Sequence, residues 1–210
     1  FYARNPHPDN LGYFSFDLVY PGGVIENVKC GIPGWVNVEN SVAAAAICLT
    51  YGVNPEAIRH AIGTFQGVKR RLDIHLNTEK ISYIDDYAHH PTEIKATLDA
   101  AASKFGKENI VAVFQPHRFT RLQSLWNEFK SAFSEAGRVI VTDVYAASED
   151  PIKGISGEAF AKDLGAEYIG GNMQEVAEKL LPTLENGNIV IGLGAGTITA
   201  LGKELEKANK

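Results

Sequence analysis

Two arginines and a histidine stand together in the segment Gln115-Pro116-His117-Arg118-Phe119-Thr120-Arg121. The apolar run before it, residues 110–114, is short and rich in β-branched residues, which is typical of a buried strand. From Leu122 onward, apolar residues recur at steps of three and four, which predicts a helix. Arg118 and Arg121 therefore add positive charge where a helix begins and unpaired N–H groups are already positive. This arrangement predicts a clamp for a carboxylate or phosphate, although two solvated arginines on a surface turn would give the same pattern.

Two adjacent histidines follow another expected strand, residues 81–85, in the segment Asp85-Asp86-Tyr87-Ala88-His89-His90-Pro91-Thr92-Glu93. Pro91 fits the opening position of a helix, so both rings lie at a helix entrance. Either ring could cap that helix or be buried, or the pair could hold a cation or a phosphate together with the preceding aspartates. Because no third ligand follows at a standard zinc spacing, we expect no structural zinc site.

Two further unusual segments, residues 143–150 and 192–197, also follow expected strands. In an open parallel sheet the carboxyl ends of the strands lie along one edge, which is where such folds bind ligands. Four segments at that edge indicate a ligand site better than any one of them. The glycine-rich turn at 192–197 is only a weak dinucleotide signal, and the chain has no G-x-x-x-x-G-K-[ST] phosphate loop. We therefore expect a loop that holds a nucleoside triphosphate to lie outside these residues.

The elements that position these segments alternate between strands and helices. Such alternation predicts an α/β fold with a mostly parallel sheet and helices on both faces. The expected strands are residues 71–76, 81–85, 110–115, 139–143, 167–169 and 188–193, and the expected helices are residues 91–105, 122–136, 156–164, 174–181 and 197–207.

Residues 1–68 follow a different pattern. Strands at 13–20 and 24–29, joined by a turn at Pro21-Gly22-Gly23, predict a hairpin. The helix expected at 41–50 is apolar nearly all round and needs cover on most sides. One hairpin and a short helix at 55–62 cannot supply that cover. We therefore expect residues 1–68 to be the tail of a larger α/β domain whose first part precedes them.

Composition limits the class of protein. A chain of 210 residues suits one or two domains, and 20 Lys and Arg against 25 Asp and Glu give a net charge of −5. No basic run appears, which argues against nucleic acid or an anionic membrane as the main partner. Cys30 and Cys48 lie in apolar sequence, as buried thiols in a reducing compartment do. With no membrane-spanning apolar stretch and no signal peptide in this sequence, we expect a cytoplasmic protein.

Several of these segments together resemble the Mur ligases, and the resemblance covers most of the chain. It implies an enzyme of three domains, in which residues 1–68 are the C-terminal part of the central ATP-binding domain. Residues 69–210 would then be the Rossmann-like C-terminal domain. The matching segments are Gly67-Val68-Lys69-Arg70-Arg71, the motif from Asp86 to Glu93, Pro116-His117-Arg118-Phe119-Thr120-Arg121, Asp143-Val144-Tyr145-Ala146-Ala147 and Asp150-Pro151-Ile152-Lys153-Gly154-Ile155-Ser156-Gly157.

The resemblance implies an ATP-dependent, amide-forming ligase of peptidoglycan synthesis, which serves cell-wall biogenesis, cell shape and cell division. Such an enzyme activates the carboxylate of UDP-N-acetylmuramate as an acyl phosphate, and the amine of L-alanine then attacks it. The implied cofactors are ATP and Mg²⁺, and the implied partners are these small molecules and the N-terminal domains of the same enzyme. The chain alone would be inactive. Two alternatives stay open: a recycling ligase that attaches a whole peptide, and a nucleotide- or anion-binding module without catalysis.

The resemblance also assigns residues to the acceptor side of the site. His117, Arg118 and Arg121 match positions that hold the amino-acid acceptor, in agreement with the predicted anion clamp. His89 matches a histidine near the reacting centre. The two arginines would fix the carboxylate of alanine and leave its amine free to attack.

On the nucleotide side, Arg71 matches an arginine that reaches the phosphates of ATP, and Asp86 matches an aspartate near the nucleotide. Asn37 and Asn40 match an N-x-x-N pattern whose side chains face adenine. The family usually has a histidine just before the first asparagine, where this chain has Val36. Without the family, the two asparagines read equally well as the N-cap and first turn of the apolar helix.

Overall fold

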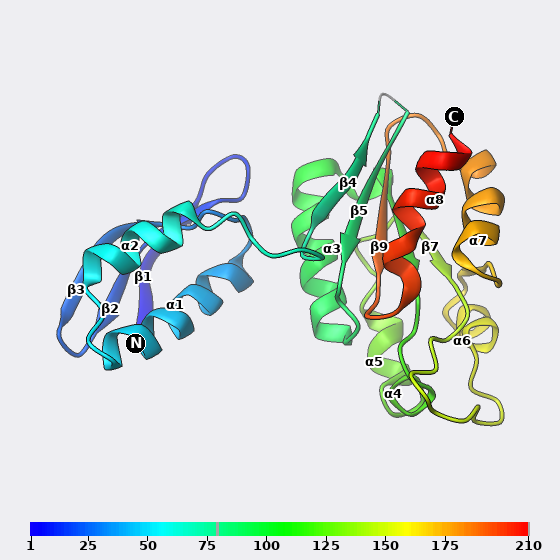
Figure 1. Cartoon of the computed structure of the whole chain (residues 1–210), viewed down its shortest axis with the longest axis horizontal. Helices are drawn as coiled ribbons and strands as arrows, with labels where there is room; N and C mark the ends of the chain where they lie inside the picture. Colours follow the sequence, from blue (N-terminus) through cyan, green and yellow to red (C-terminus); the bar gives the residue numbers. More distant parts are fainter. Residues whose placement is uncertain (79, 210) are drawn as a thin grey trace. The chain divides into compact units, whose positions relative to one another are not determined.

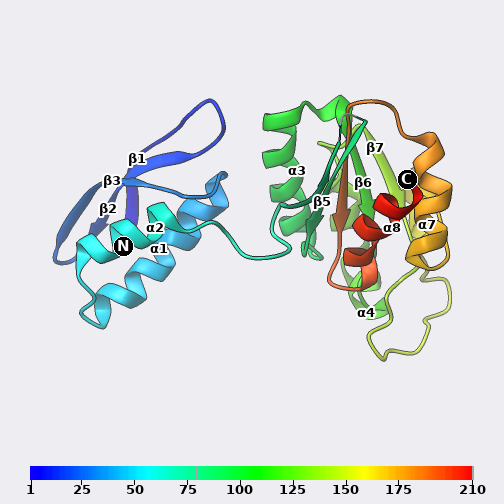
Figure 2. The ribbon, with the colours of Figure 1, turned by 45° about the horizontal axis from the view of Figure 1, so that its top comes forward.

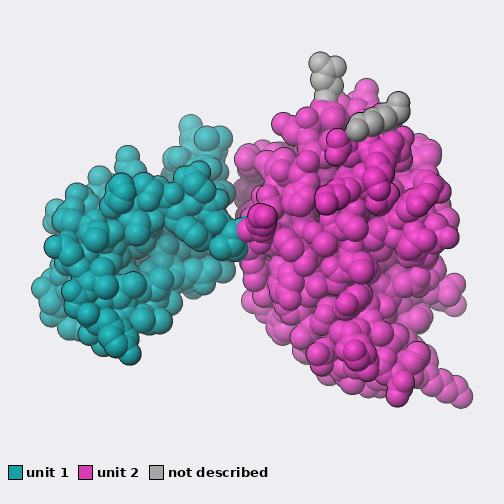
Figure 3. Space-filling model, viewed as in Figure 1, with its two compact units in different colours: residues 1–68 teal, residues 69–210 magenta. Residues whose placement is uncertain are grey.

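The computed structural model describes residues 1–78 and 80–209. The chain divides into two compact units, Phe1–Val68 (unit 1) and Lys69–Lys210 (unit 2), shown in separate colours in Figure 3. Unit 1 contains one cluster of buried apolar residues, and unit 2 contains two. Within the described residues, none of the helices is long and apolar enough to cross a membrane.

Unit 1 contains an antiparallel sheet of three strands in the order β1 (Tyr2–Pro8), β2 (Phe14–Tyr20) and β3 (Gly23–Lys29). The predicted hairpin is confirmed, because Tyr20 pairs with Gly23 and leaves a two-residue turn between β2 and β3. Strand β1 was not predicted. Its sequence, YARNPHP, is polar and contains two prolines, and most of its side chains are exposed at the edge of the sheet.

Two helices pack on this sheet, α1 (Trp35–Thr50) and α2 (Pro55–Thr64). Helix α1 begins earlier than the sequence predicted, directly after Gly34. Its inner face buries Val38 and Ala45, whereas Ile47 on the other side is 64% exposed. The strands and α2 therefore cover only one face of this apolar helix. The buried residues between the sheet and the two helices are Phe16, Leu18, Ile25, Val28, Cys30, Val38, Ala45 and Ile58.

Unit 2 contains a six-stranded sheet in the order β4-β5-β9-β6-β7-β8. Only β4 runs antiparallel to its neighbour, and the other four pairings are parallel, as predicted for a mostly parallel sheet. The strands are β4 (Asp73–Asn77), β5 (Ile81–Asp86), β6 (Ile110–Phe114), β7 (Arg138–Val141), β8 (Glu167–Tyr168) and β9 (Asn188–Leu193).

Helices cover both faces of this sheet, as Figures 1 and 2 show. Side chains from α3 (Pro91–Phe105), α4 (Phe119–Ser124), α5 (Trp126–Ser131) and α6 (Gly157–Leu164) join one buried cluster around Phe114. On the opposite face, α7 (Met173–Leu180) and α8 (Leu201–Ala208) pack around Tyr83. Because the central strands are buried on both faces, they read as continuous apolar runs.

Two predicted helices differ in detail from the structure. The helix expected at 122–136 begins at Phe119 and is interrupted at Leu125, whose φ of −114° and ψ of 23° are not helical. No glycine or proline marks this break, so periodicity alone could not show it. The helix expected at 197–207 starts with a 3-10 turn, Thr197–Ala200, before α8.

Candidate functional site

The four unusual segments lie at one edge of the sheet in unit 2. They follow β5, β9, β6 and β7, which are neighbours in that order. The strand ends are level, because Leu193 of β9 pairs with both Asp86 and Phe114, and Phe114 pairs with Val141. The prediction that these segments share the carboxyl edge of a parallel sheet is confirmed.

His117 is fixed by the loop that follows β7. Past their ends, β6 and β7 remain linked by a bridge between His117 and Tyr145. The backbone N–H of Arg118 donates to the carbonyl of Tyr145 at 2.9 Å, and the N–H of Tyr145 donates to Pro116 at 2.8 Å. The two rings stack, with centroids 5.4 Å apart and planes 22° apart. Stacking and backbone pairing together hold the imidazole in one orientation.

Arg121 lies directly against this ring, with its Nη1 atom 3.2 Å from Nδ1 of His117. Burial lowers the pKa of His117, and the positive charges of Arg121, His89 and Arg118 lower it further. The ring is therefore held neutral at a place where three basic side chains meet.

The loop after β5 brings His89 to the same place. Its ring meets that of His117 edge-on at a centroid distance of 5.7 Å. The backbone N–H groups of His89 and His90 both donate to Glu93 Oε2, at 3.0 and 3.2 Å. The ring of His90 accepts from the backbone N–H of Thr92 and caps α3. The structure thus separates the two histidines: His90 caps the helix, and His89 faces His117.

Arg118 faces a carboxylate that the sequence did not single out. Its Nη1 atom is 3.8 Å from Oε1 of Glu149 in the loop after β7. Glu149 also accepts hydrogen bonds from the backbone N–H and the hydroxyl of Thr120, at 3.0 and 2.6 Å. Glu149 therefore caps α4 from outside the helix. The sequence suggested that N–H groups at this helix start would be free to bind an anion, but the N–H of Thr120 already donates to Glu149. The guanidinium groups of Arg118 and Arg121 remain, beside an open hollow of about 570 Å³.

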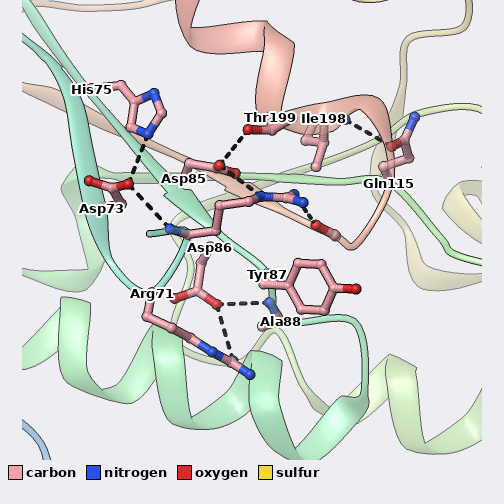
Figure 4. A network of polar contacts seen from close by, with 12 residues as sticks. Arg71, Asp73, His75, Asp85, Asp86, Tyr87, Ala88, Gln115, Ile198 and Thr199 are labelled. Carbon is pink, nitrogen blue, oxygen red and sulfur yellow. Dashed lines mark hydrogen bonds and ion pairs between the residues drawn. The ribbon is translucent and has the colours of Figure 1, made fainter. Parts of the chain in front are cut away.

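Asp86 is buried at the end of β5, and backbone donors occupy both of its oxygens; Figure 4 shows the donor from Ala88. The N–H of Leu72 donates to Oδ2 and that of Ala88 to Oδ1, each at 2.8 Å. Burial raises the pKa of this carboxyl, although the two N–H groups and Arg71 favour its ionised form. Arg71 lies 3.9 Å from Asp86 and 3.5 Å from Glu93, and its side chain is 47% exposed. The exposed guanidinium is available to a ligand, whereas Asp86 is engaged in positioning the backbone around it.

A second buried network lies beside Asp86 (Figure 4). Asp85 accepts from Nε of Arg70 at 3.0 Å and from the hydroxyl of Thr199 at 2.7 Å. Arg70 also donates to the carbonyl of Gly194 at 2.6 Å. This network ties the first residues of unit 2 to the glycine-rich turn after β9. The signal in the sequence was the pair of carboxylates at the end of an apolar strand, which a folded chain has to compensate.

Asn37 and Asn40 lie in unit 1, on α1. The N-cap of α1 is Gly34, and Asn37 in the first turn donates from its side chain to the carbonyl of Pro33 at 2.7 Å. Asn40 is exposed, on the same side of the helix as Val36 and Ile47. Asn37 therefore lies in the first turn of α1 and not at its N-cap, and the side chain of Asn40 is exposed in unit 1.

The side chains at the carboxyl edge of the sheet in unit 2 suit an anionic ligand. Arg71, Arg118 and Arg121 supply guanidinium groups, which bind carboxylates and phosphates through two parallel hydrogen bonds. Over residues 1–78 and 80–209, no group of three or more His, Cys, Asp or Glu side chains is placed so that it could hold a metal ion.

The family model, the relatives and the solved structure that match this chain agree with one another. Residues 70–196 match a family model described as "Mur ligase, glutamate ligase domain". The UDP-N-acetylmuramate–L-alanine ligase of Desulfosudis oleivorans is 37% identical over 209 residues, which are 97% of this chain and 45% of that protein. That of Caldicellulosiruptor saccharolyticus is 41% identical over 204 residues, 94% of this chain and 44% of the relative.

Among solved structures, the UDP-N-acetylmuramate-alanine ligase of Thermotoga maritima matches with a TM-score of 0.71 at 30% identity. The match covers 95% of this chain and 44% of that one. The chain therefore spans less than half the length of the relatives it matches.

Proposed function

The chain belongs to the Mur ligase family, and from that premise we propose that it is the carboxyl-terminal part of an ATP-dependent ligase that joins L-alanine to UDP-N-acetylmuramate. Relatives 37% and 41% identical carry the name of that ligase. Residues 69–210 would be the C-terminal ligase domain, and residues 1–68 the end of the central ATP-binding domain. The whole enzyme would act in the cytoplasm, in peptidoglycan precursor synthesis.

The open face of α1 supports the assignment of residues 1–68. Val36, Ile47 and Tyr51 are all exposed in unit 1, Tyr51 by 85%. Apolar side chains at this spacing form one stripe along a helix. A stripe of this kind normally packs against other sequence, as it would inside a larger domain.

The observation that carries the proposal is the meeting of His89, His117 and Arg121 at the carboxyl edge of the sheet. The two rings are 5.7 Å apart, and Arg121 is 3.2 Å from the second ring. Arg118 and Arg121 would hold the carboxylate of alanine through charge-assisted hydrogen bonds. Its amine would then be oriented for attack on an activated carboxylate, and orientation of this kind accounts for much of the rate of such reactions.

ATP, with Mg²⁺, would supply the activation of the muramic carboxylate as an acyl phosphate. In this chain, Arg71 would bind phosphate oxygens with its exposed guanidinium, which Glu93 and Asp86 flank. Asp86 would act by holding the backbone of Leu72 and Ala88. Asn37 and Asn40 would face the adenine ring, with Val36 in place of the usual histidine of the family.

The two alternatives that the sequence left open are less well supported. The relatives cited above that are at least 30% identical are named as ligases of UDP-N-acetylmuramate and L-alanine. A murein peptide ligase from Psychrobacter arcticus is only 18% identical and supports the fold alone. A binding module without catalysis would account for the cluster of basic side chains, but the relatives above carry the names of ligases.

The test is the substitution Arg121→Ala in the full-length gene product. Loss of one charge-assisted hydrogen bond costs about 1.5–3 kcal/mol, so the KM for alanine should rise about 10- to 150-fold. The KM for ATP should change far less. The matched control is Arg59→Ala, because Arg59 is an exposed arginine on α2 that pairs with Glu56 of the same helix; it should leave both constants unchanged. Equal effects of Arg121→Ala on alanine and ATP would contradict the acceptor role.

A further inference from the structure

The glycine-rich turn after β9, residues 192–197, has glycines that face the protein itself. A methyl group on Gly196 would lie 2.5 Å from Oε1 of Gln115 and 2.6 Å from Cγ of Tyr145. A methyl group on Gly194 would lie 2.7 Å from the carbonyl oxygen of Gln115, and the φ of Gly194 is 150°, which other residues rarely adopt. The turn therefore needs its glycines because two other segments of unit 2 approach it closely.

Gln115 fills the space that these glycines leave. Its side chain is buried, and an amide group is costly to bury without hydrogen bonds. Oε1 accepts from the backbone N–H of Ile198 at 2.9 Å (Figure 4), and Nε2 donates to the hydroxyl of Thr197 at 2.9 Å. The backbone N–H of Gln115 donates to the carbonyl of Leu193 at 2.9 Å. Three hydrogen bonds at one residue thus join the end of β6 to the turn after β9.

The turn is also held by groups from β5 and from the segment before β4. The hydroxyl of Tyr83, which is buried, donates to the carbonyl of Ile198 at 3.0 Å. Nη2 of Arg70 donates to the carbonyl of Gly194 at 2.6 Å. Because these contacts come from two further segments, the turn gives Gln115 a fixed surface to bind.

Gln115 directly precedes the segment that carries His117. The residue between them is Pro116, whose ring restricts the backbone. The carbonyl of Pro116 accepts from the N–H of Tyr145 at 2.8 Å, and the ring of Tyr145 stacks on that of His117. Tyr145 also lies against Gly196. The turn therefore contacts both the residue that leads into this segment and the side chain that stacks on its histidine.

We propose that Gln115 is a positioning residue, which anchors the loop after β6 on the glycine-rich turn. The glycines of the turn serve this anchor and do not bind a phosphate group. The effect on catalysis rests on the proposed function, whereas the anchor itself does not. A misplacement of about 1 Å caused by a residue that does not touch the substrate costs about 10²-fold in rate.

Amide hydrogen exchange in the chain tests the anchor without substrate. In the wild type, the amide of Ile198 should exchange far more slowly than an exposed amide, because it donates to Gln115. Gln115→Met keeps the length of the side chain and removes the amide group. In this variant the amides of Ile198, Tyr145 and Arg118 should exchange about tenfold faster or more. The amides of α3 report any general loss of stability and should exchange at the wild-type rate.

Three results of this experiment would overturn the proposal, whether or not the full-length product ligates alanine. Fast exchange of Ile198 in the wild type would show that Gln115 does not hold the turn. Faster exchange confined to Ile198 in the variant would show a bond with no effect on the loop. Equally faster exchange in α3 would show that Gln115 supports the whole fold of unit 2 and not the loop in particular.

Kinetics of the full-length gene product separate an anchor from a phosphate-binding turn. Gly196→Ala places a methyl group against Gln115 and Tyr145. The kcat/KM for alanine should therefore fall about 10- to 10²-fold, while the KM for ATP changes less than about threefold. Gln115→Met should give the same pattern. The matched control is Gly63→Ala on α2, where the added methyl group would lie 3.5 Å from the carbonyl oxygen of Lys29, an ordinary contact; it should leave both constants unchanged.

The anchor and the proposed function fail in different ways. If Gly196→Ala raised the KM for ATP more than it lowered kcat/KM for alanine, the turn would bind the nucleotide and the proposal would be overturned. The same follows if Gly196→Ala and Gln115→Met both ligate alanine within about threefold of the wild type. A full-length product that ligates no alanine would end the proposed function, and hydrogen exchange would still decide whether Gln115 anchors the loop.

Discussion

At the scale of single residues, the carboxylates of Glu93 and Glu149 at the carboxyl edge of the sheet accept hydrogen bonds from backbone N–H groups of the protein itself. Glu93 accepts from the backbone N–H groups of His89 and His90 and lies 3.5 Å from Arg71. Burial tends to raise the pKa of Glu93, but the N–H of His89 and the charges of His89 and Arg71 outweigh it, so the pKa is lowered. Glu149 likewise accepts from the backbone N–H of Thr120 in α4 and lies 3.8 Å from Arg118. A carboxylate accepts several hydrogen bonds at once, so it can join segments that are distant in sequence.

The lowered pKa of His117 predicts how its contribution to stability depends on pH. The ordinary histidine pKa is 6.5. Below that value the unfolded chain binds a proton at His117 before the folded chain does, so the folded state loses stability as the pH falls. At higher pH the ring is neutral in both states, and this loss is absent. Removing the ring by His117→Gln should therefore remove a term that destabilises the protein only in acid.

Urea unfolding of the wild-type chain and of His117→Gln at about pH 7.5 and about pH 5.5 measures this term. The free energy of unfolding of the wild type minus that of the variant should be smaller at the lower pH than at the higher pH. If the two proteins differed in free energy of unfolding by the same amount at both pH values, the ring would titrate alike in the folded and unfolded states.

At the scale of elements, the buried network around Asp85 joins three segments of unit 2. Arg70 precedes β4, Asp85 ends β5, and Thr199 lies in the 3-10 turn after β9. Arg70 and Leu72 have φ values of 62° and 48°, which are unfavourable for residues with a side chain. The hydrogen bonds from Arg70 to Asp85 and from Leu72 to Asp86 hold this backbone in place. The segment that carries Arg71 is therefore positioned by the sheet beneath it.

The substitution Thr199→Val tests this network, because it keeps the shape of the side chain and removes the hydroxyl that donates to Asp85. A hydrogen bond to a buried charged group contributes about 1.5–3 kcal/mol, so the free energy of unfolding of unit 2 should fall by about that amount. Thr92→Val, at an exposed position in the first turn of α3, should change it by less than about 0.5 kcal/mol. If the two variants were equally stable in urea titrations, the network would not be what holds this segment.

The sequence predicted most of these elements because their signals are local. The apolar run at 110–114 predicted a strand, and the motif at 85–93 predicted the start of a helix. Both predictions placed the following loops at the carboxyl edge of the sheet. The break at Leu125 and the cap that Glu149 gives to Thr120 were not predictable, since both depend on contacts made only in the folded chain. The same holds for the stacking of Tyr145 on its histidine partner. Local patterns therefore located the site, and contacts between distant segments determined its geometry.

At the scale of the whole molecule, the two units differ in how completely they bury their apolar residues. The sheet of unit 2 has a buried apolar cluster on each face, whereas the sheet of unit 1 packs on one layer of helices. The exposed stripe on α1 runs through Val36, Ile47 and Tyr51. If residues 1–68 are the end of a larger domain, this stripe is covered in the full-length product and open in the chain alone.

The substitution Ile47→Lys distinguishes these two environments. In the chain alone, Ile47 is 64% exposed, so the substitution should change the free energy of unfolding by less than about 0.5 kcal/mol. In the full-length product the same change would remove a buried apolar side chain and bury a charge, at a cost of at least about 2–5 kcal/mol. His60→Lys, at an exposed position on α2 and outside the stripe, introduces the same side chain and should have little effect in either protein. Urea unfolding of both lengths gives the comparison, and a full-length product that tolerates Ile47→Lys as well as His60→Lys would mean that the stripe stays exposed. Residues 1–68 would then have to complete their own fold, and the assignment to a larger ATP-binding domain would lose its physical basis.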